Sequence, residues 1–375
     1  MNQMVFSVQE FEDRAKKIRQ QMKNRDMDAL ILTRAENIYY VSGFRAAHFS
    51  CYLSELHALV IPSEGEPRIM TRALEREIAK LQWTKEPKLF KDHEDPYAVL
   101  VGILQESGNT ASKIGIEERF LSVRQFSKIR QYLPNAQFSD ATGLVESVAV
   151  TLSKAESECV RKAARITDIG FQKGIEEVRE GAYPYEIIGE IHKAMYKAGQ
   201  SDFDLALVCV WAGSRGGRMH DTSTTERIKK GDIVTVEIMG VDNQYKAGSQ
   251  GSIYVGDSPP DTIMEAYNMV ADMLLKARGS VRAGVTPGAV FDAANSVYRA
   301  ARGDDYYRRV GGSMGLTIFN LDLVKGRQDI LKPGVPLLIQ TLVDDPALLT
   351  CTMTVMVTED GSEQLTQPLL KLKMA

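Results

Sequence analysis

The chain lacks the features of a secreted, membrane-spanning or zinc-knuckle protein. Its 375 residues include four cysteines but no Cys-x-x-Cys pair, which argues against a zinc knuckle or a dithiol redox motif. No apolar run approaches the ~18 residues of a membrane span, and the first residues do not show the basic region and apolar stretch of a secretion signal. These absences predict a cytoplasmic protein with reduced cysteines.

The chain also lacks an excess of charge of either sign. The chain has 46 basic and 49 acidic residues and a net charge of −3, with 44% hydrophobic residues. This composition is typical of a globular protein. Without a basic patch or tract, we expect neither a nucleic-acid partner nor a membrane surface, and a small-molecule substrate is the expected partner.

The length and the pattern of elements predict two domains. A chain of 375 residues exceeds the usual size of one hydrophobic core. Residues 1–150 alternate amphipathic helices with short apolar strands, such as a helix over 8–25 and strands over 28–33 and 113–117. This alternation predicts a mixed α/β domain, with a boundary near residues 145–153.

The pattern of residues 151–375 predicts, in chain order, two helices, a group of strands, two more helices and a second group of strands. Ser153 and Glu156 have the spacing of a capping box and predict a helix start. Residues 231–256 predict a hairpin that turns at 241–244. The fold class is therefore α/β, or more narrowly α+β, with two similar halves in the second domain.

Several phrases, in order and over nearly the whole chain, resemble the creatinase/aminopeptidase P (M24) family. They are ENIYYVSGF, TLSKAESECVRKAARI, RIKKGDIVTVE, LKPGVPLLIQ and VTEDGSEQLT. The resemblance implies a creatinase-like N-terminal domain over 1–150 and a pita-bread catalytic domain over 151–375. Most members of the family are peptidases with two divalent metals, held by two Asp, one His and two Glu.

The resemblance places these five ligand positions, in chain order, on Glu237, Gly248, Gly312, Gln340 and Thr352. Four of the five lack the family's ligand. The stretch RVGGSMGLTIFN keeps the shape of the family's turn without its histidine, and a later histidine falls on Phe319. Two dications need several anionic oxygens to offset their dehydration, so the sequence predicts neither a metal nor another cofactor.

Two residues are expected to be catalytic. By resemblance, His220 falls on a histidine that metal-free creatinase is thought to use as its acid/base, and an imidazole suits proton transfer at neutral pH. Glu237 would orient His220, bind a cationic group, or act as a base with a raised pKa. The alternatives are a leftover loop histidine and an exposed strand glutamate.

Substrate binding is expected from uncharged residues of the same cavity and from the N-terminal loop. These residues are Tyr245, Gln250, Gln340 and Thr352 in the cavity, and Arg45, His48 and Glu55 in the loop. In creatinase the guanidinium is held by two glutamates, which fall on Gln250 and Thr352 here, and the arginine that holds the carboxylate falls loosely on Glu55. Creatine itself is therefore a poor fit.

The sequence favours a metal-independent, creatinase-like hydrolase of a non-peptide C–N bond in a small polar molecule. A lyase or cyclase would use the same residues. A third reading is a pita-bread module that binds a ligand without turnover. An Xaa-Pro metallopeptidase with rearranged ligands is disfavoured, because four of the five ligand positions lack the family's ligand.

By resemblance we also predict a homodimer in which the N-terminal domain completes the neighbour's cleft. Sedimentation at micromolar concentration is expected to give twice the chain mass of 41.7 kDa. A monomer alone at this concentration would contradict the prediction.

Overall fold

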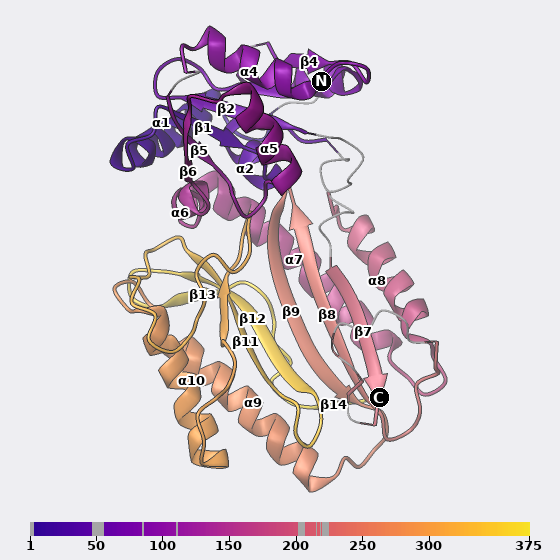
Figure 1. The fold of residues 1–375 in the computed structure, drawn as a ribbon. Helices are drawn as coiled ribbons and strands as arrows, with labels where there is room; N and C mark the ends of the chain where they lie inside the picture. Colours follow the sequence, from indigo (N-terminus) through magenta and orange to yellow (C-terminus); the bar gives the residue numbers. More distant parts are fainter. Residues whose placement is uncertain are drawn as a thin grey trace. The chain divides into compact units, whose positions relative to one another are not determined.

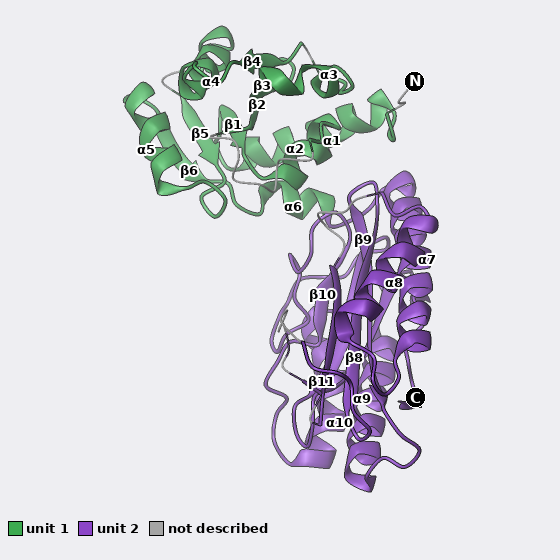
Figure 2. Ribbon diagram, turned by 90° about the vertical axis from the view of Figure 1, so that its right-hand side faces the viewer, with its two compact units in different colours: residues 1–149 green, residues 150–375 purple. Residues whose placement is uncertain are grey.

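The computed structural model describes residues 4–46, 56–84, 86–109, 112–201, 207–214, 216–217, 219 and 225–375. The chain forms two compact units, residues 1–149 and residues 150–375 (Figure 2). Each unit is described by itself.

Unit 1 is built on a six-stranded sheet in the order β4-β3-β2-β1-β5-β6. Its strands are β1 (Ala29–Leu32), β2 (Ala58–Pro62), β3 (Arg68–Arg72), β4 (Lys88–Phe90), β5 (Lys113–Ile116) and β6 (Gln137–Asp140). β1, β5 and β6 run parallel, whereas β2 is antiparallel to both of its neighbours. The expected mixed α/β layer is confirmed.

The helices of unit 1 pack on this sheet and on one another. They are α1 (Val8–Asn24), α2 (Ala35–Ser42), η1 (Ala73–Glu75), α3 (Arg76–Ala79), α4 (Pro96–Glu106), α5 (Val123–Tyr132) and α6 (Leu144–Ala149). α4 packs against β2, β3 and β4, while α1 packs against α2 and α6. The core between α4 and the sheet consists of fully buried aliphatic residues such as Val60, Leu100 and Ile114.

Unit 2 is built on an eight-stranded sheet. The main path is β10-β11-β12-β9-β8-β7, with β13 beside β12 and β14 beside β9. Its strands are β7 (Leu207–Gly213), β8 (Ile233–Asp242), β9 (Tyr245–Tyr254), β10 (Gly311–Ser313), β11 (Pro336–Val343), β12 (Leu349–Val357), β13 (Ser362–Gln364) and β14 (Lys373–Met374).

Four long helices pack on one face of this sheet (Figure 1). They are α7 (Lys154–Glu177), α8 (Pro184–Lys197), α9 (Asp261–Ser280) and α10 (Pro287–Arg302). α7 lies against β8 and β9, α8 against β7, and α9 against β11 and β12, while α10 packs on α9. Every second side chain of the central strands projects from the opposite face, away from these helices.

The capping box predicted at the start of α7 is present in full. The Ser153 hydroxyl accepts from Glu156 N at 3.2 Å, and the Glu156 carboxylate accepts from Ser153 N at 2.6 Å. Both bonds satisfy amides that the first helical turn leaves unpaired. They fix the residue at which α7 begins.

The predicted hairpin is confirmed as β8 and β9. Asn243 and Gln244 form its turn with φ values of 48° and 71°, and Asp242 pairs with Tyr245. Two positive φ values are those of a two-residue type I′ turn, whose twist matches that of the strands. The turn fixes the register of all ten residue pairs in the hairpin.

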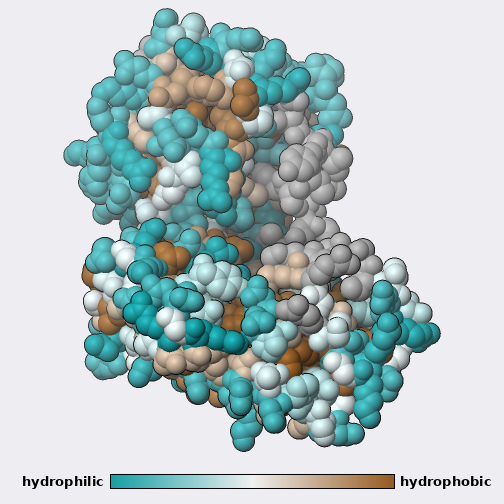
Figure 3. Space-filling view, turned by 60° about the horizontal axis from the view of Figure 1, so that its bottom comes forward, coloured by the Kyte–Doolittle hydropathy of each residue, from teal (hydrophilic) through white to brown (hydrophobic). Residues whose placement is uncertain are grey.

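Among the described residues, no helix is both long enough and apolar enough to cross a membrane. On the face drawn in Figure 3, hydrophilic residues predominate and hydrophobic ones lie in small groups between them. Scattered apolar side chains are normal on the surface of a folded domain.

The contact between α7 and β8 leaves no room for a side chain at Gly240. An added Cβ would lie 2.6 Å from both Ala163 O and Thr167 Oγ1. We expect Gly240→Ala to lower the free energy of unfolding of unit 2 by about 1–3 kcal/mol, as overpacking does. Urea unfolding in a Trp83→Phe background, where the buried Trp211 is the remaining tryptophan, measures this change.

Gly189 is the matched control. It lies within α8, and an added Cβ would meet nothing within 4 Å. Gly189→Ala should leave the stability of unit 2 unchanged or raise it by up to ~1 kcal/mol, because alanine is the better helix former. Equal effects of the two substitutions would contradict the assigned packing.

Candidate functional site

One residue from each of five neighbouring strands of unit 2 lies in a single row across the sheet. Cys209 of β7 pairs with Glu237 of β8, and Glu237 pairs with Gln250 of β9. Gln250 pairs with Thr352 of β12, and Thr352 pairs with Gln340 of β11. Residues directly opposite each other on adjacent strands project from the same face of a sheet.

The row lies on the face away from the helices. Val236 and Ile238 point at α7, since their side chains lie 2.9 and 3.3 Å from Cβ atoms built at Gly174 and Gly170 of that helix. Because side chains alternate along a strand, Glu237 projects from the other face. We call the five residues Cys209, Glu237, Gln250, Thr352 and Gln340 the polar row.

Hydrogen bonds fix the amides of the polar row. Gln340 Nε2 donates to Gln250 Oε1 at 2.9 Å, and the Thr350 hydroxyl donates to the same oxygen at 3.1 Å. Gln250 Nε2 and Thr352 Oγ1 are buried and have no hydrogen-bond partner among the described residues. Buried polar atoms of this kind are costly unless a ligand or water satisfies them.

Glu237 is the carboxylate of the polar row. Burial raises the pKa of Glu237 to about 7, and the positive charge of Arg308 opposes this rise. Burial, together with the charge of Glu237, raises the pKa of Cys209 to about 11. At neutral pH the row therefore presents a thiol and a carboxyl group that is close to half-protonated, which suits proton transfer.

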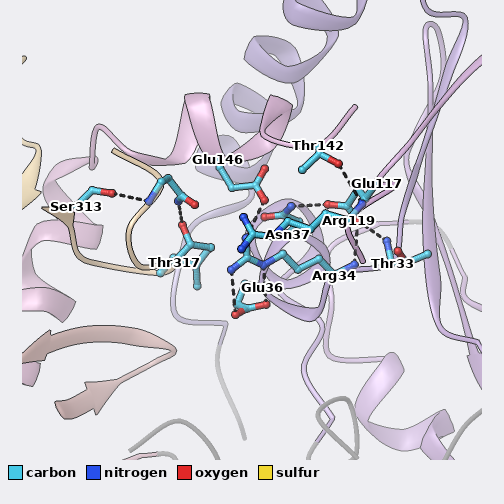
Figure 4. Close-up of polar contacts among 12 residues, drawn as sticks. Thr33, Arg34, Glu36, Asn37, Glu117, Arg119, Thr142, Glu146, Ser313 and Thr317 are labelled. Carbon is cyan, nitrogen blue, oxygen red and sulfur yellow. Dashed lines mark hydrogen bonds and ion pairs between the residues drawn. The ribbon is translucent and has the colours of Figure 1, made fainter. Parts of the chain in front are cut away.

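The glycine-rich stretch beside the row is a tightly bonded loop. Ser313 Oγ accepts from Asn320 N and Leu321 N, both at 3.1 Å; Ser313 and Thr317 appear in Figure 4. Phe319 has a φ of 56°, which is uncommon for a bulky residue. The Arg309 guanidinium lies 3.9 Å from the centre of the Phe319 ring and stabilises this conformation by a cation–π contact.

A second polar cluster lies in unit 1, at the start of α2 (Figure 4). The buried Glu117 carboxylate accepts from Thr33 N at 2.6 Å and Arg34 N at 2.8 Å, and also from the Asn37 amide. Arg34 in turn donates to Glu146 at 2.8 Å. Burial raises the pKa of Glu117 to about 7. Glu117 satisfies amides at the helix N-terminus, so its role is structural.

The structure corrects the expected place of Tyr245. Its hydroxyl donates to Glu156 of α7 at 2.5 Å, and its side chain is fully buried. Odd-numbered positions of β9 face the helices, whereas Gln250 faces the other way. Tyr245 therefore holds β9 to the start of α7 and does not line the row.

Four other expected site residues cannot be compared with the row. His48, Glu55 and His220 lie outside the described residues. Arg45 is described and is half-buried in unit 1, after the C-cap Gly43 of α2. The roles assigned to these four residues stay predictions.

Two residues near the row were missed by the sequence analysis. Cys209 is paired with Glu237 across β7 and β8, a relation that the sequence pattern does not give. Arg308 comes just before the glycine-rich stretch, and its charge acts on Glu237 through space. Only the folded structure shows that Cys209 pairs with Glu237 and that the charge of Arg308 acts on Glu237.

Two family models match this chain. The creatinase/prolidase N-terminal domain matches residues 14–148, and metallopeptidase family M24 matches residues 158–359, more than half of the chain. The chain belongs to metallopeptidase family M24. The expected architecture, a creatinase-like N-terminal domain followed by a pita-bread M24 domain, is confirmed, and hydrolytic peptidases make up this family.

Relatives match the M24 chain along nearly its whole length. An uncharacterised hydrolase/peptidase, y4tL, of Sinorhizobium fredii is 27% identical, over 97% of this chain and 96% of that protein. An Xaa-Pro dipeptidase of Pyrococcus horikoshii is 24% identical, over 95% of this chain and 97% of that protein.

Solved structures share the fold. A prolidase from Thermococcus sibiricus has a TM-score of 0.87 at 21% identity, over 97% of this chain and 99% of that one. The N-terminal domain of the FACT complex subunit SPT16 from chickpea has a TM-score of 0.75 at 14% identity, over 96% and 97% of the two chains. At these identities the likeness is one of fold.

These comparisons overturn the predicted function. The predicted metal-independent, creatinase-like hydrolase of a non-peptide C–N bond is not supported, because the similar proteins include several Xaa-Pro dipeptidases and a prolidase. The prediction was wrong because it let four substituted positions outweigh a similarity that spans the whole chain. The Xaa-Pro peptidase reading, disfavoured from the sequence, is the better supported one.

The described residues of the M24 domain do not fit the pair of divalent metals that the family name implies. In the described ranges, no three His, Cys, Asp or Glu side chains group as metal ligands. A Cβ at Gly248 would lie 3.1 Å from Leu338 Cδ1, and one at Gly312 would lie 2.7 Å from Phe319 Cδ1. One carboxylate, two amides and a hydroxyl are too few anionic donors for two dications.

Glu237 gives unit 2 a pH-dependent stability. Because its pKa is raised from 4.5 to about 7, the folded chain holds a proton in this window that the unfolded chain releases. The contribution of Glu237 is therefore full below pH ~4.5 and is lost as the pH rises through ~7. We expect Glu237→Gln to raise the free energy of unfolding at pH 8 by on the order of 1–3 kcal/mol, and by much less at pH 4.5.

Urea unfolding of both chains in the Trp83→Phe background, at several pH values, measures this difference. Comparison with the parent chain cancels the similar contribution of Glu117. Glu265→Gln, on the exposed face of α9, is the control and should leave the pH profile unchanged. If the free energy of unfolding changed with pH in the same way in Glu237→Gln and in its parent, the raised pKa of Glu237 would be contradicted.

Proposed function

We propose that the chain is a hydrolase of short peptides, which bind over the polar row. The alignment of Glu237, Gln250 and Thr352 on three neighbouring strands, with Gln250 paired to both of the others on one face of the M24 sheet, carries this proposal. Membership of a peptidase family supports the reaction class. The relatives named Xaa-Pro dipeptidases support Xaa-Pro dipeptides as the first substrates to test.

Glu237 is the proposed general base. Its carboxylate takes a proton from a water molecule whose oxygen attacks the amide carbon, and it passes that proton to the leaving nitrogen as the C–N bond breaks. A group with a pKa near the working pH is the most effective for both transfers. Glu237, with a pKa of about 7, meets this condition at neutral pH.

Gln250 and Thr352 are the proposed donors to the amide oxygen. Gln250 Nε2 and Thr352 Oγ1 have no partner among the described residues, while the Gln250 amide is held in place through its oxygen by Gln340. Donors fixed before the substrate arrives stabilise negative charge on the carbonyl oxygen without reorganisation.

A second candidate function is ligand binding without turnover. The donor set of the polar row, with its single carboxylate, favours this candidate over a metal-dependent reaction at the row. The fold shared with the SPT16 domain is compatible with it. Binding of a dipeptide without release of product would support this candidate.

Hydrolysis of Ala-Pro and Gly-Pro, followed by chromatography, tests the proposal. We expect Glu237→Gln to lower kcat by ~10²-fold or more, the usual effect of removing a general base. Glu265→Gln is the control and should retain the parental rate. Each assay is run with added Mn²⁺ and with a chelator, since activity that needs Mn²⁺ would place metal ligands beyond the polar row.

Two outcomes would contradict the proposal. One is the absence of product from every dipeptide under both conditions. The other is an unchanged kcat in Glu237→Gln, which would show that another group moves the proton.

A further inference from the structure

Three buried hydroxyl groups lie beside the polar row, one on each of the strands β8, β9 and β12. We call them the hydroxyl row: Thr235, Ser252 and Thr350. Each is two residues from a member of the polar row on its own strand, so all three project from the same face of the sheet as that row. All three are 0% exposed. Buried hydroxyl groups are costly unless they are hydrogen-bonded, so their partners indicate what they do.

Ser252 fixes the place of Thr350. The direct pairing of β9 with β12 covers two residue pairs. Just beyond these pairs, Ser252 Oγ accepts from Thr350 N at 3.1 Å, and Thr235 Oγ1 lies within hydrogen-bond distance of the same oxygen, at 3.2 Å. A side chain therefore takes the backbone donor that the strand ladder leaves free, and it holds Thr350 beside Gln250.

Thr350 in turn holds the amide of Gln250. Its hydroxyl donates to Gln250 Oε1 at 3.1 Å and shares its proton with Thr341 O at the same distance. Gln340 Nε2 donates to Gln250 Oε1 at 2.9 Å. The amide oxygen is thus bound from β12 and from β11. Because the nitrogen and the oxygen of an amide point in different directions, Gln250 Nε2 is turned away from both donors.

Hydrogen bonds decide which end of the Gln250 amide faces a ligand, because the reversed amide has nearly the same shape. Gln340 lies on one side of Gln250 in the polar row and Glu237 lies on the other. An ionised carboxylate favours a donor on its own side. The observed orientation therefore suits both neighbours of Gln250, and it leaves Nε2 as a buried donor without a partner in the described ranges.

We propose that Thr350 is a positioning residue, whose buried hydroxyl holds the Gln250 amide so that Nε2 rather than Oε1 faces the amide oxygen of the substrate. This inference rests on the proposed function, in which Gln250 is one of the donors to that oxygen. Thr350 is fully buried and acts through Gln250. A donor that is aligned before the oxygen gains negative charge stabilises the transition state without reorganisation.

Steady-state hydrolysis of Ala-Pro tests this role. Thr350→Val removes the hydroxyl and keeps the branched shape of the side chain. We expect kcat to fall by about tenfold or more, as part of the ~10²–10³-fold that the loss of an oxyanion donor costs. KM should change little, because the interaction is made mainly in the transition state. Thr350→Ser keeps the hydroxyl and should restore most of kcat.

Thr341→Val is the matched control. Thr341 is also 0% exposed, but its hydroxyl donates to Val270 O of α9 at 2.8 Å, on the helix side of the sheet. This substitution should lower the free energy of unfolding, measured with urea in the Trp83→Phe background, without lowering kcat. An unchanged kcat in Thr350→Val, or an equal loss of kcat in both valine variants, would overturn the inference.

Neutron diffraction from crystals of the parent chain gives a readout that needs no turnover, because it distinguishes nitrogen from oxygen and locates deuterium. We expect the deuterium of the Thr350 hydroxyl to point toward Gln250 Oε1, and both deuterium atoms on Gln250 Nε2 to face away from Thr350. In Thr350→Val both orientations of the amide should be populated. A Gln250 Nε2 that faces Thr350 in the parent chain would overturn the inference.

The two readouts separate this inference from the proposed function. A parent chain that releases no product from Ala-Pro, but orients Gln250 as expected and loses that orientation in Thr350→Val, would keep the positioning role of Thr350 and remove the hydrolase proposal. Hydrolysis of Ala-Pro at the same kcat in the parent chain and in Thr350→Val would do the reverse.

Discussion

The register of the β8–β9 hairpin is the constraint on which the candidate site depends. A two-residue turn at Asn243 and Gln244 pairs Glu237 with Gln250. Because side chains alternate, a slip of one residue would turn both side chains toward α7 and bring Val236 and Gly251 to the face away from the helices. The tight contact of Gly240 with α7 opposes such a slip from the helix side. The turn and the contact with α7 together determine which side chains project from the face away from the helices.

The electrostatics of the row follow from this placement. Its members other than Glu237 are uncharged at neutral pH, because burial keeps the Cys209 thiol protonated and the rest are amides and a hydroxyl. A single carboxylate among neutral groups has little nearby positive charge to offset the cost of burying its negative charge. Burial therefore dominates, and the pKa of Glu237 rises. The cation that acts on it, Arg308, stays out of contact. The resulting group exchanges a proton near neutrality, which a fully paired carboxylate would not do.

The fold was largely predictable because its signals are local. The capping box at Ser153 and the turn at Asn243 each depend on a few adjacent residues, and both were found. Gln250, Gln340 and Thr352 were grouped by matching family positions, and the structure places them side by side with Glu237. Tyr245 was misplaced because the matching ignored strand alternation. Arg308 was missed because its relation to Glu237 runs through space. The predicted hydrolase class is supported by the family, whereas metal-independent cleavage of a non-peptide bond was wrong because single positions were weighed above similarity along the whole chain.

The packing around the glycine-rich stretch limits which side chains positions 248 and 312 can accept. Phe319 occupies the space where a side chain at Gly312 would project, and Leu338 and Met314 close in on Gly248. A single exchange at either glycine would meet steric resistance before any new ligand could act. At Gly248 the neighbours are the ends of flexible side chains, which can move aside by a few tenths of an ångström. At Gly312 a larger residue requires both the Phe319 ring and the Leu321 carbonyl to shift, so this position is the more firmly closed to substitution.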